Sequence, residues 1–179
     1  MNQIPAASAK HDRQANANAN GNATATQTRI AFISSSWHND IVHKAHDAFL
    51  DEFERSNVPR KQVDQFEVPG AFEIPLHAKK LAQTGLYDAI VACGLVVNGG
   101  IYRHEFVASA VIDGLMRVQL DTDVPILSAV LTPRDFHEHA DHYRFFSEHF
   151  VKKGIEVARA CLDTVTGLRA LSAADVTQR

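Results

Sequence analysis

The sequence has little cysteine, no excess of positive charge and no long hydrophobic run. Its 179 residues include two cysteines, too few for a disulfide framework and typical of a reducing compartment. The formal net charge of −3 offers no broad basic surface for a phosphate backbone, so we expect no nucleic acid partner. Apolar runs such as Ala89–Val97 are shorter than the roughly 20 residues that cross a bilayer. With no charged start followed by an apolar core, we expect a cytoplasmic protein without a secretory signal or a membrane partner.

Motifs for several cofactor classes are also missing. Neither a Walker motif nor G-x-G-x-x-G occurs, so ATP and dinucleotides are not expected. His137, His139 and His142 raise the question of a metal, because histidines three residues apart can share a helix face. Their spacing does not match H-E-x-x-H, and no distant cysteine or acidic partner presents itself. We therefore expect no metal site.

What remains is the composition of an ordinary globular domain, with 45% hydrophobic and 22% charged residues. Residues 1–28 differ, because this Asn/Ala-rich stretch has almost no large apolar residue to offset its ordering entropy. We expect residues 1–28 to be a disordered N-terminal tail. Residues 29–169 are then a single domain, and residues 170–179 form a C-terminal tail.

Within the domain, short apolar runs alternate with longer amphipathic stretches. The runs predict buried strands at Ile30–Ser34, Val63–Val68, Ala89–Val97 and Pro125–Leu131. A first helix is predicted from a cap at Asn39 or Asp40, with Ile41, Val42, Ala45, Phe49 and Phe53 at helical spacing. Three further helices are predicted over Phe72–Gln83, over about 102–120, and over Phe145–Val165 with an end near Gly167. This alternation predicts an α/β fold in which a parallel sheet lies between two layers of helices.

In such sheets, ligands bind beyond the carboxyl ends of the strands. The segments that follow the four predicted strands should therefore converge on one rim of the sheet. They are Trp37, Pro69–Glu73, Val97–His104 and Thr132–His142.

Several residues in these segments could carry chemistry. Asn98-Gly99-Gly100 follows a buried strand and opens a helix, which suits either an anion site at a helix N-terminus or a plain tight turn. Arg103 and His104 lie in the first helical turn, where the helix dipole opposes cations. Either a bound anion or a solvated basic pair would explain them. Histidine is also the side chain best suited to move protons near neutral pH.

Two further side chains each have two interpretations. Trp37 could stack on a planar heterocycle or pack at the edge of the core. Glu73 could satisfy the N–H groups at a helix start or accept hydrogen bonds from a polyol. The residues alone leave both alternatives open.

Three segments together resemble the lumazine synthase family: Val68–Pro75 (VPGAFEIP), Gly94–Val107 (GLVVNGGIYRHEFV) and Lys153-Gly154. The resemblance covers residues 29–169. It implies a four-stranded parallel sheet with helices on both faces and flavodoxin-like topology. It also implies condensation of 5-amino-6-(D-ribitylamino)uracil with 3,4-dihydroxy-2-butanone 4-phosphate in riboflavin biosynthesis, without a metal or organic cofactor. Family members are homo-oligomers built of pentamers, with active sites shared between neighbouring subunits.

The resemblance also implies roles for individual residues. Trp37 corresponds to the aromatic side chain that stacks on the pyrimidine, and Ala71, Phe72 and Glu73 to residues that line the ribityl and ring pocket. The other substrate-binding positions are Leu95, Val96 and Val97 at the uracil edge, Gly100, Ile101 and Lys153 near the phosphate, and Ser128 toward a neighbouring subunit.

This chain departs from the family pattern at the catalytic position. The family's histidine falls on Arg103, and His104 comes one residue later. Arginine stays protonated, so it can stabilise an anion but cannot easily transfer protons. We expect Arg103 and His104 to share the acid–base role, with the division between them open. Because the stretch from Thr132 to Lys153 is longer than in many members, the family's phosphate-binding arginine could correspond to His142 or Arg144.

The leading hypothesis is therefore a lumazine synthase. Three alternatives stand beside it: a flavin or lumazine carrier on the same scaffold, a histidine-dependent metal hydrolase, and an assembly with a structural task. Turnover, bound flavin or bound metal would distinguish them.

Overall fold

The computed structural model describes residues 28–100, 103–134, 136 and 139–177. A four-stranded parallel sheet forms its centre, in the order β2-β1-β3-β4. The strands are β1 (Ile30–Ser35), β2 (Val63–Val68), β3 (Ala89–Leu95) and β4 (Ile126–Leu131). Every residue of β1 and β3 is buried, because these inner strands are covered on both faces. The edge strands β2 and β4 are partly exposed.

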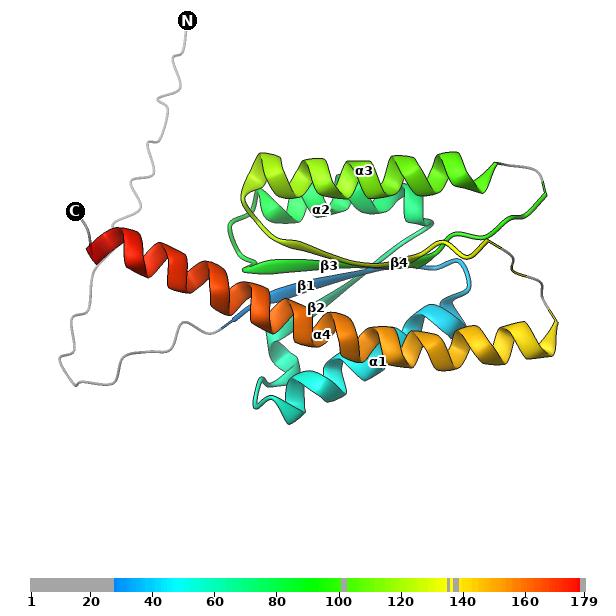
Figure 1. The fold of residues 1–179 in the computed structure, drawn as a ribbon, viewed down its shortest axis with the longest axis horizontal. Helices are drawn as coiled ribbons and strands as arrows, with labels where there is room; N and C mark the ends of the chain where they lie inside the picture. Colours follow the sequence, from blue (N-terminus) through cyan, green and yellow to red (C-terminus); the bar gives the residue numbers. More distant parts are fainter. Residues whose placement is uncertain (1–27, 101–102, 135, 137–138, 178–179) are drawn as a thin grey trace, which may run out of the picture.

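Helices cover both faces of the sheet. α1 (Asn39–Arg55) and α4 (Ala140–Thr177) lie on one face, and α2 (Ile74–Ala82) and α3 (His104–Thr122) lie on the other (Figure 1). Two short 3₁₀ turns, Arg60–Gln62 and Ala71–Glu73, precede β2 and α2. The predicted three-layer α/β sandwich is confirmed, and the strand order is that of flavodoxin-like folds.

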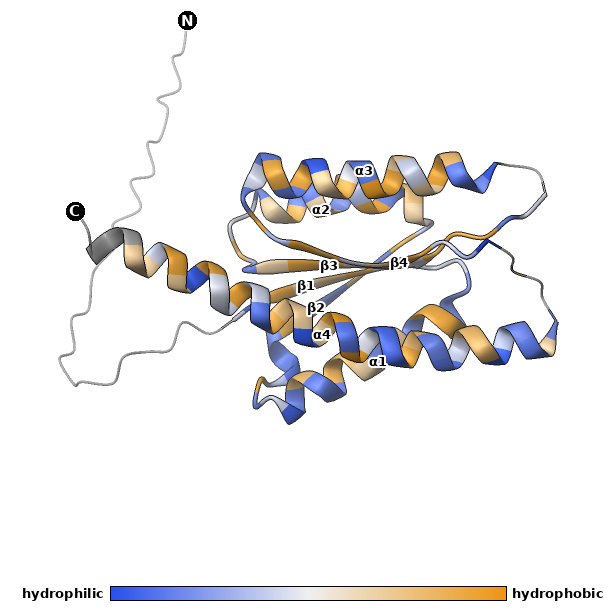
Figure 2. Ribbon diagram, viewed as in Figure 1, coloured by the Kyte–Doolittle hydropathy of each residue, from blue (hydrophilic) through white to orange (hydrophobic). Residues whose placement is uncertain are grey.

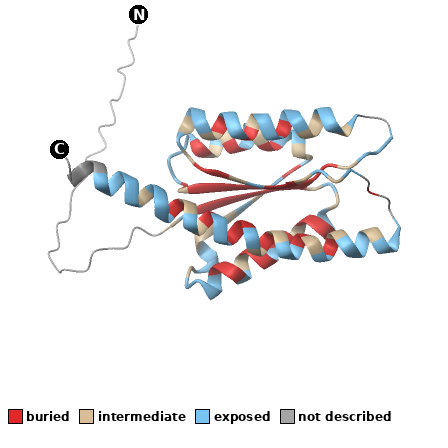
Figure 3. Ribbon diagram, in the orientation of Figure 1, coloured by how far each residue is buried: buried red, intermediate tan, exposed pale blue. Residues whose placement is uncertain are grey.

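The sheet divides the core in two, because successive side chains of a strand point to opposite faces. Phe32 joins Phe49, Phe53 and Phe150 in the core under α1 and α4. Its neighbours Ala31 and Ile33 join a second core under α2 and α3, which is built mainly from aliphatic side chains. Hydrophobic residues concentrate in the strands (Figure 2), and buried residues line the inner sides of the helices (Figure 3).

The strands agree with the sequence prediction to within two residues at each end, whereas the last helix does not. We predicted Phe145–Val165 with an end near Gly167, but α4 spans Ala140–Thr177. A glycine inside a helix costs only about 1 kcal/mol relative to alanine. Beyond it, Arg169 donates hydrogen bonds to Asp88 Oδ1 at 2.8 Å and Thr28 Oγ1 at 3.0 Å. These contacts hold the helix against the sheet past Gly167, so residues 170–177, which we expected to be a tail, continue the helix.

The other helix starts differ less. The helix predicted over Phe72–Gln83 opens with a 3₁₀ turn and becomes α-helical at Ile74. α3 begins at His104 rather than near residue 102. Within the described part of the chain, no helix is both long and apolar enough to cross a membrane. The predicted N-terminal tail, apart from Thr28, lies outside the described residues.

Candidate active site

The segments that follow the strands meet at the carboxyl edge of the sheet. The Ser36 N–H donates to the Val68 carbonyl at 2.8 Å, and Ser36 Oγ donates to the Pro69 carbonyl at 3.0 Å. The rings of His38 and Phe136 pack edge to face, 5.2 Å between centroids. These contacts join the segments after β1, β2 and β4, so the convergence predicted from the parallel-sheet rule is present in the structure.

A glycine brings the turn after β2 close to the sheet. A Cβ on Gly94, near the end of β3, would lie 3.0 Å from Ser35 Oγ and 3.5 Å from Ala71 Cβ. The missing side chain therefore lets the Ala71–Glu73 turn pack over β1 and β3. Ala71 is half-buried in this position, whereas Phe72 and Glu73 project into solvent.

Two large aromatic side chains are exposed on the rim. Trp37 is 67% exposed and Phe72 is 64% exposed. Within the isolated chain, the indole of Trp37 does not pack at the edge of the core, which was one of its two interpretations. Both rings are free to contact a planar ligand, and stacking stays a prediction.

Glu73 also lacks the local role that its position suggested. It stands directly before α2, yet its side chain makes no capping hydrogen bond. Its carboxylate folds back over Gly70, where a Cβ would lie 3.1 Å from Oε2. Among the described residues, the structure records no hydrogen bond or ion pair of this carboxylate. It is available to accept hydrogen bonds from hydroxyl groups.

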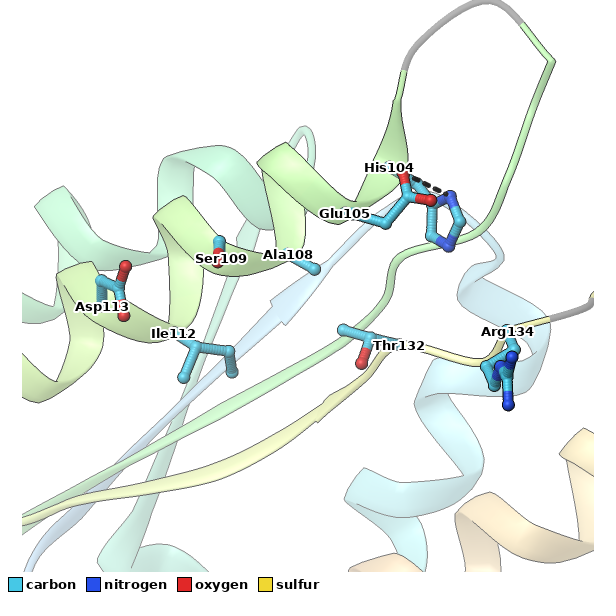
Figure 4. Close-up of a pocket in the computed structure, with 8 residues that line it drawn as sticks. All are labelled: His104, Glu105, Ala108, Ser109, Ile112, Asp113, Thr132 and Arg134. Carbon is cyan, nitrogen blue, oxygen red and sulfur yellow. Dashed lines mark ion pairs between the residues drawn. The ribbon is translucent and has the colours of Figure 1, made fainter.

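A cavity of about 620 Å³ lies between α3 and the segment that follows β4. Its lining comes from one side of α3 and from two residues beyond β4 (Figure 4). The lining residues are His104, Glu105, Ala108, Ser109, Ile112, Asp113, Thr132 and Arg134.

The structure separates Arg103 from His104. The His104 side chain is 11% exposed, lines the cavity, and has Nδ1 3.4 Å from Glu105 Oε2. Arg103 is exposed and its guanidinium lies over the Phe106 ring, 5.0 Å from the centroid. Arg103 is the N-cap of α3 and has an extended backbone (φ −75°, ψ 92°), whereas His104 is the first helical residue. The two neighbours therefore have different backbone conformations and face different surroundings.

Some of the backbone groups predicted to bind substrate already form hydrogen bonds within the chain. The Val96 N–H donates to the Leu131 carbonyl at 2.9 Å, so this amide cannot also bind a uracil. Leu95 is buried and Val97 is half-buried at the end of β3. The Gly100 N–H donates to Asn98 Oδ1 at 3.1 Å, in a turn where Gly100 has a φ of 76°. Ile101 lies outside the described residues.

The remaining predicted residues do not line the cavity. Ser128 is exposed on β4, and its Oγ accepts a hydrogen bond from the Val130 N–H at 3.3 Å. Lys153 pairs with Glu156 at 2.6 Å, and Arg144 pairs with Asp141 at 3.3 Å. The His142 ring lies 6.4 Å from that of Phe146.

Thr132 and Arg134 were not among the predicted site residues, although both lie in a segment predicted to reach the rim. They are the first and third residues after β4. The strand-end rule alone would have found them, because it applies to every residue that follows a parallel strand.

The two cysteine thiols do not line the cavity. Cys93 and Cys161 are free and buried, and burial raises the pKa of the Cys161 thiol to about 12. The pKa of Cys93 is raised further by complete burial, so neither thiol is a nucleophile near neutral pH. Across the described residues, no three His, Cys, Asp or Glu side chains gather in a group that could hold a metal ion. His137 of the predicted histidine cluster lies outside them.

Comparison with known proteins gives one consistent family. The family model for 6,7-dimethyl-8-ribityllumazine synthase matches residues 27–169. A 6,7-dimethyl-8-ribityllumazine synthase of Rhodococcus erythropolis is 66% identical over 80% of this chain and 92% of its own length. A 6,7-dimethyl-8-ribityllumazine synthase 2 of Bradyrhizobium diazoefficiens is 59% identical over 80% of this chain and 86% of its own length. A synthase of Thermococcus kodakarensis is 37% identical over 80% of this chain and 88% of its own.

Proposed function

The chain belongs to the 6,7-dimethyl-8-ribityllumazine synthase family, and we propose that it condenses 5-amino-6-(D-ribitylamino)uracil with 3,4-dihydroxy-2-butanone 4-phosphate. The product is 6,7-dimethyl-8-ribityllumazine, a precursor of riboflavin. The relatives named as synthases are up to 66% identical over nearly their whole length, which favours a synthase over a carrier on the same scaffold.

The observation that carries the proposal is the position of His104. Its imidazole lines a cavity at the carboxyl edge of a parallel sheet, where α/β proteins bind their ligands. Trp37, Phe72 and Glu73 lie on the same edge with exposed side chains. A substrate with a heterocycle, a polyol chain and a reacting amine requires an aromatic surface to stack on, a hydrogen-bond acceptor and a group that transfers protons.

We assign the acid–base role to His104 and an electrostatic role to Arg103. The reaction proceeds through imine formation, phosphate elimination, ring closure and loss of water, and each of these steps moves protons. An imidazole can take up and release protons near neutral pH, whereas a guanidinium cannot. The exposed Arg103 can attract anionic substrate to the rim without transferring a proton. Much of the remaining acceleration can come from holding both substrates together.

The proposal includes assembly into a homo-oligomer with shared sites. Four large apolar side chains of α3 stay exposed in the single chain: Phe106 (65%), Ile112 (40%), Met116 (54%) and Leu120 (70%). A helix that is apolar on both its inner and outer sides is usually covered on both. The free, buried thiols of Cys93 and Cys161 fit a reducing compartment such as the cytoplasm.

The test is direct turnover. Purified protein is mixed with both substrates, and lumazine formation is followed by absorbance beside a reaction without enzyme. We expect saturable turnover, a loss of about 10²–10⁴-fold in kcat for His104→Ala, and a smaller loss for Arg103→Ala. His77→Ala, an exposed histidine on α2, is the matched control and should behave as the wild type.

Two outcomes would contradict the proposal. Absence of turnover with substrates that a known synthase converts would remove the enzymatic function, and tight riboflavin binding in the same preparation would favour the carrier. A wild-type rate in His104→Ala with a large loss in Arg103→Ala would reverse the division of roles.

A further inference from the structure

The interior of α3 contains one glycine, Gly114. Glycine is less favourable than alanine inside a helix, so its presence there needs a physical reason. The structure supplies one, because a Cβ on Gly114 would lie 3.0 Å from Pro75 Cβ and 3.1 Å from Pro75 Cγ. An ordinary contact between two carbon atoms is about 3.5–4.0 Å. The two helices therefore approach this closely only because Gly114 has no side chain.

The segment that carries Pro75 is supported by the sheet on its other side. Pro75 lies in the first turn of α2, two residues after Glu73. A Cβ on Gly94 of β3 would lie 3.5 Å from Ala71 Cβ and 3.6 Å from Ile74 Cδ1. Ile74 is fully buried between α2 and the sheet. The segment is thus held between β3 and α3 and cannot retreat, so a larger side chain on α3 would displace α3 instead.

A displacement of α3 reaches His104 at its start. His104 lies ten positions before Gly114, about 15 Å along the helix axis. α3 runs beside α2 on the same face of the sheet (Figure 1), and its Val111 and Leu115 are buried in the core under both helices. A helix packed in this way transmits a shift along its length, because the interior is close-packed. The contact with Pro75 therefore sets the distance between His104 and the turn that precedes α2.

We propose that Gly114 is a positioning residue for catalysis, because its contact with Pro75 determines where His104 lies relative to Glu73. This inference rests on the proposed function, in which His104 transfers protons to and from the substrates. Gly114 is not one of the residues that line the cavity, so it acts through His104 rather than on a substrate. Proton transfer requires hydrogen-bond reach, and a misplacement of about 1 Å can lower a rate by about 10²-fold.

The first test separates the rate from the fold. Gly114→Ala adds one methyl group, so we expect kcat to fall about three- to tenfold while the KM for each substrate stays close to the wild-type value. Gly114→Val adds a larger group and should lower kcat further. The melting temperature of Gly114→Ala should change little, because the gain in helix propensity offsets the tighter contact. A rise in KM at unchanged kcat would contradict the proposal.

Gly167→Ala is the matched control. It is also a change from glycine to alanine inside a helix, but no atom lies within 4 Å of a Cβ at that position. It should keep the wild-type kcat. An equal fall in kcat for Gly167→Ala would overturn the proposal, because the loss would then not depend on the contact with Pro75.

The second test asks whether Gly114 acts through the contact and through His104. Pro75→Gly removes both carbon atoms that a Cβ at residue 114 would meet, so Gly114→Ala combined with Pro75→Gly should recover most of the lost kcat. Gly114→Ala added to His104→Ala should cause no further loss, because the group that it displaces is already absent. Additive losses, or no recovery in the variant with Pro75→Gly, would overturn the inference.

The third measurement does not depend on turnover. In crystal structures of the wild type and of Gly114→Ala, the distance between the Cα atoms of His104 and Glu73 should increase in the variant and return when Pro75→Gly is added. An unchanged distance would overturn the inference. Wild-type turnover with the same kcat in Gly114→Ala would overturn this inference and leave the proposed function standing. Absence of turnover in the wild type would instead remove the proposed function, and the role of Gly114 in catalysis with it.

Discussion

At the scale of single residues, burial controls which histidines can gain and lose a proton. His104 is nearly buried but opens onto a cavity, so a ligand or solvent can exchange protons with it. His46 is buried in the core between α1 and the sheet, with its ring edge-on to Phe32 at 4.9 Å. Burial lowers the pKa of His46, and the nearby positive groups His43 and Arg60 lower it further against an opposing effect of Asp47.

The lowered pKa of His46 predicts how stability depends on pH. The unfolded chain, in which the pKa of histidine is about 6.5, binds the proton more readily than the folded chain. The free energy of unfolding should therefore rise with pH up to about 6.5 and level off above it. His46→Phe should flatten this rise, measured by urea denaturation at a series of pH values. His77→Phe on the exposed face of α2 should leave the slope unchanged. An unaltered slope in His46→Phe would rule out this explanation.

Trp37 provides a second prediction at this scale. Because its indole is 67% exposed, Trp37→Ala should leave the melting temperature almost unchanged. The same change should weaken binding of a ribitylaminouracil analogue by about 1–3 kcal/mol, the contribution of stacking between a base and an aromatic ring. Calorimetry with the analogue measures the affinity. Wild-type affinity in the variant would exclude stacking on Trp37.

At the scale of elements, the contact between α1 and α4 depends on one glycine. A Cβ on Gly154 would overlap the Ala45 carbonyl oxygen and lie 2.9 Å from its carbonyl carbon. The close approach also brings Arg159 of α4 within 2.7 Å of the nearly buried Glu52 carboxylate on α1. This hydrogen bond is the largest of the effects that lower the pKa of Glu52. The Lys153-Gly154 pair of the family motif therefore has a packing role at its second position.

Two glycines on the same helix give a matched comparison. Gly154→Ala should destabilise the protein by about 1–3 kcal/mol or more, because the new methyl group forces the two helices apart. Gly167→Ala should instead stabilise it by about 0.5–1 kcal/mol, because no atom lies within 4 Å of a Cβ at that position. Chemical denaturation of both variants measures the difference. A similar free energy of unfolding for the two variants would contradict the close packing at Gly154.

At the scale of the whole molecule, the exposed apolar side chains of α3 predict that the chain associates with copies of itself. The inner residues Val111, Leu115 and Val118 of α3 pack on the sheet, while Met116 and Leu120 remain exposed on the outside. We predict that the protein sediments as a homo-oligomer. Met116→Glu combined with Leu120→Glu should shift it toward smaller species, because two carboxylates would be buried without partners at the interface.

The control for this prediction is Lys44→Glu, which changes the charge on an exposed position of α1. It should leave the sedimentation profile as in the wild type. A wild-type protein that sediments as a monomer at micromolar concentration would exclude the proposed shared sites.

The sequence by itself determined the fold class, because short apolar runs such as Ala89–Leu95 alternate with longer amphipathic stretches, a pattern that favours buried parallel strands between helices. The family resemblance predicted from Val68–Pro75 and Gly94–Val107 is confirmed by relatives that match over most of the chain. The strand-end rule also predicted which segments meet at the rim. These features follow from the local pattern of apolar and polar residues along the chain.

Only the tertiary structure decided which side chains on that rim face the cavity. Arg103 and His104 are adjacent in the sequence, but His104 begins α3 and lines the cavity, whereas the extended Arg103 before it lies over Phe106. Arg144 and Lys153 were predicted near the phosphate, but in the structure each forms an ion pair with an acidic neighbour on α4. Gly167 was expected to end the last helix, yet Arg169 forms hydrogen bonds with Thr28 and Asp88, which precede β1 and β3, and the helix continues. The orientation of a side chain, the partner that a charged group pairs with and a contact between distant residues are all relations in space, and no periodicity of the sequence encodes them.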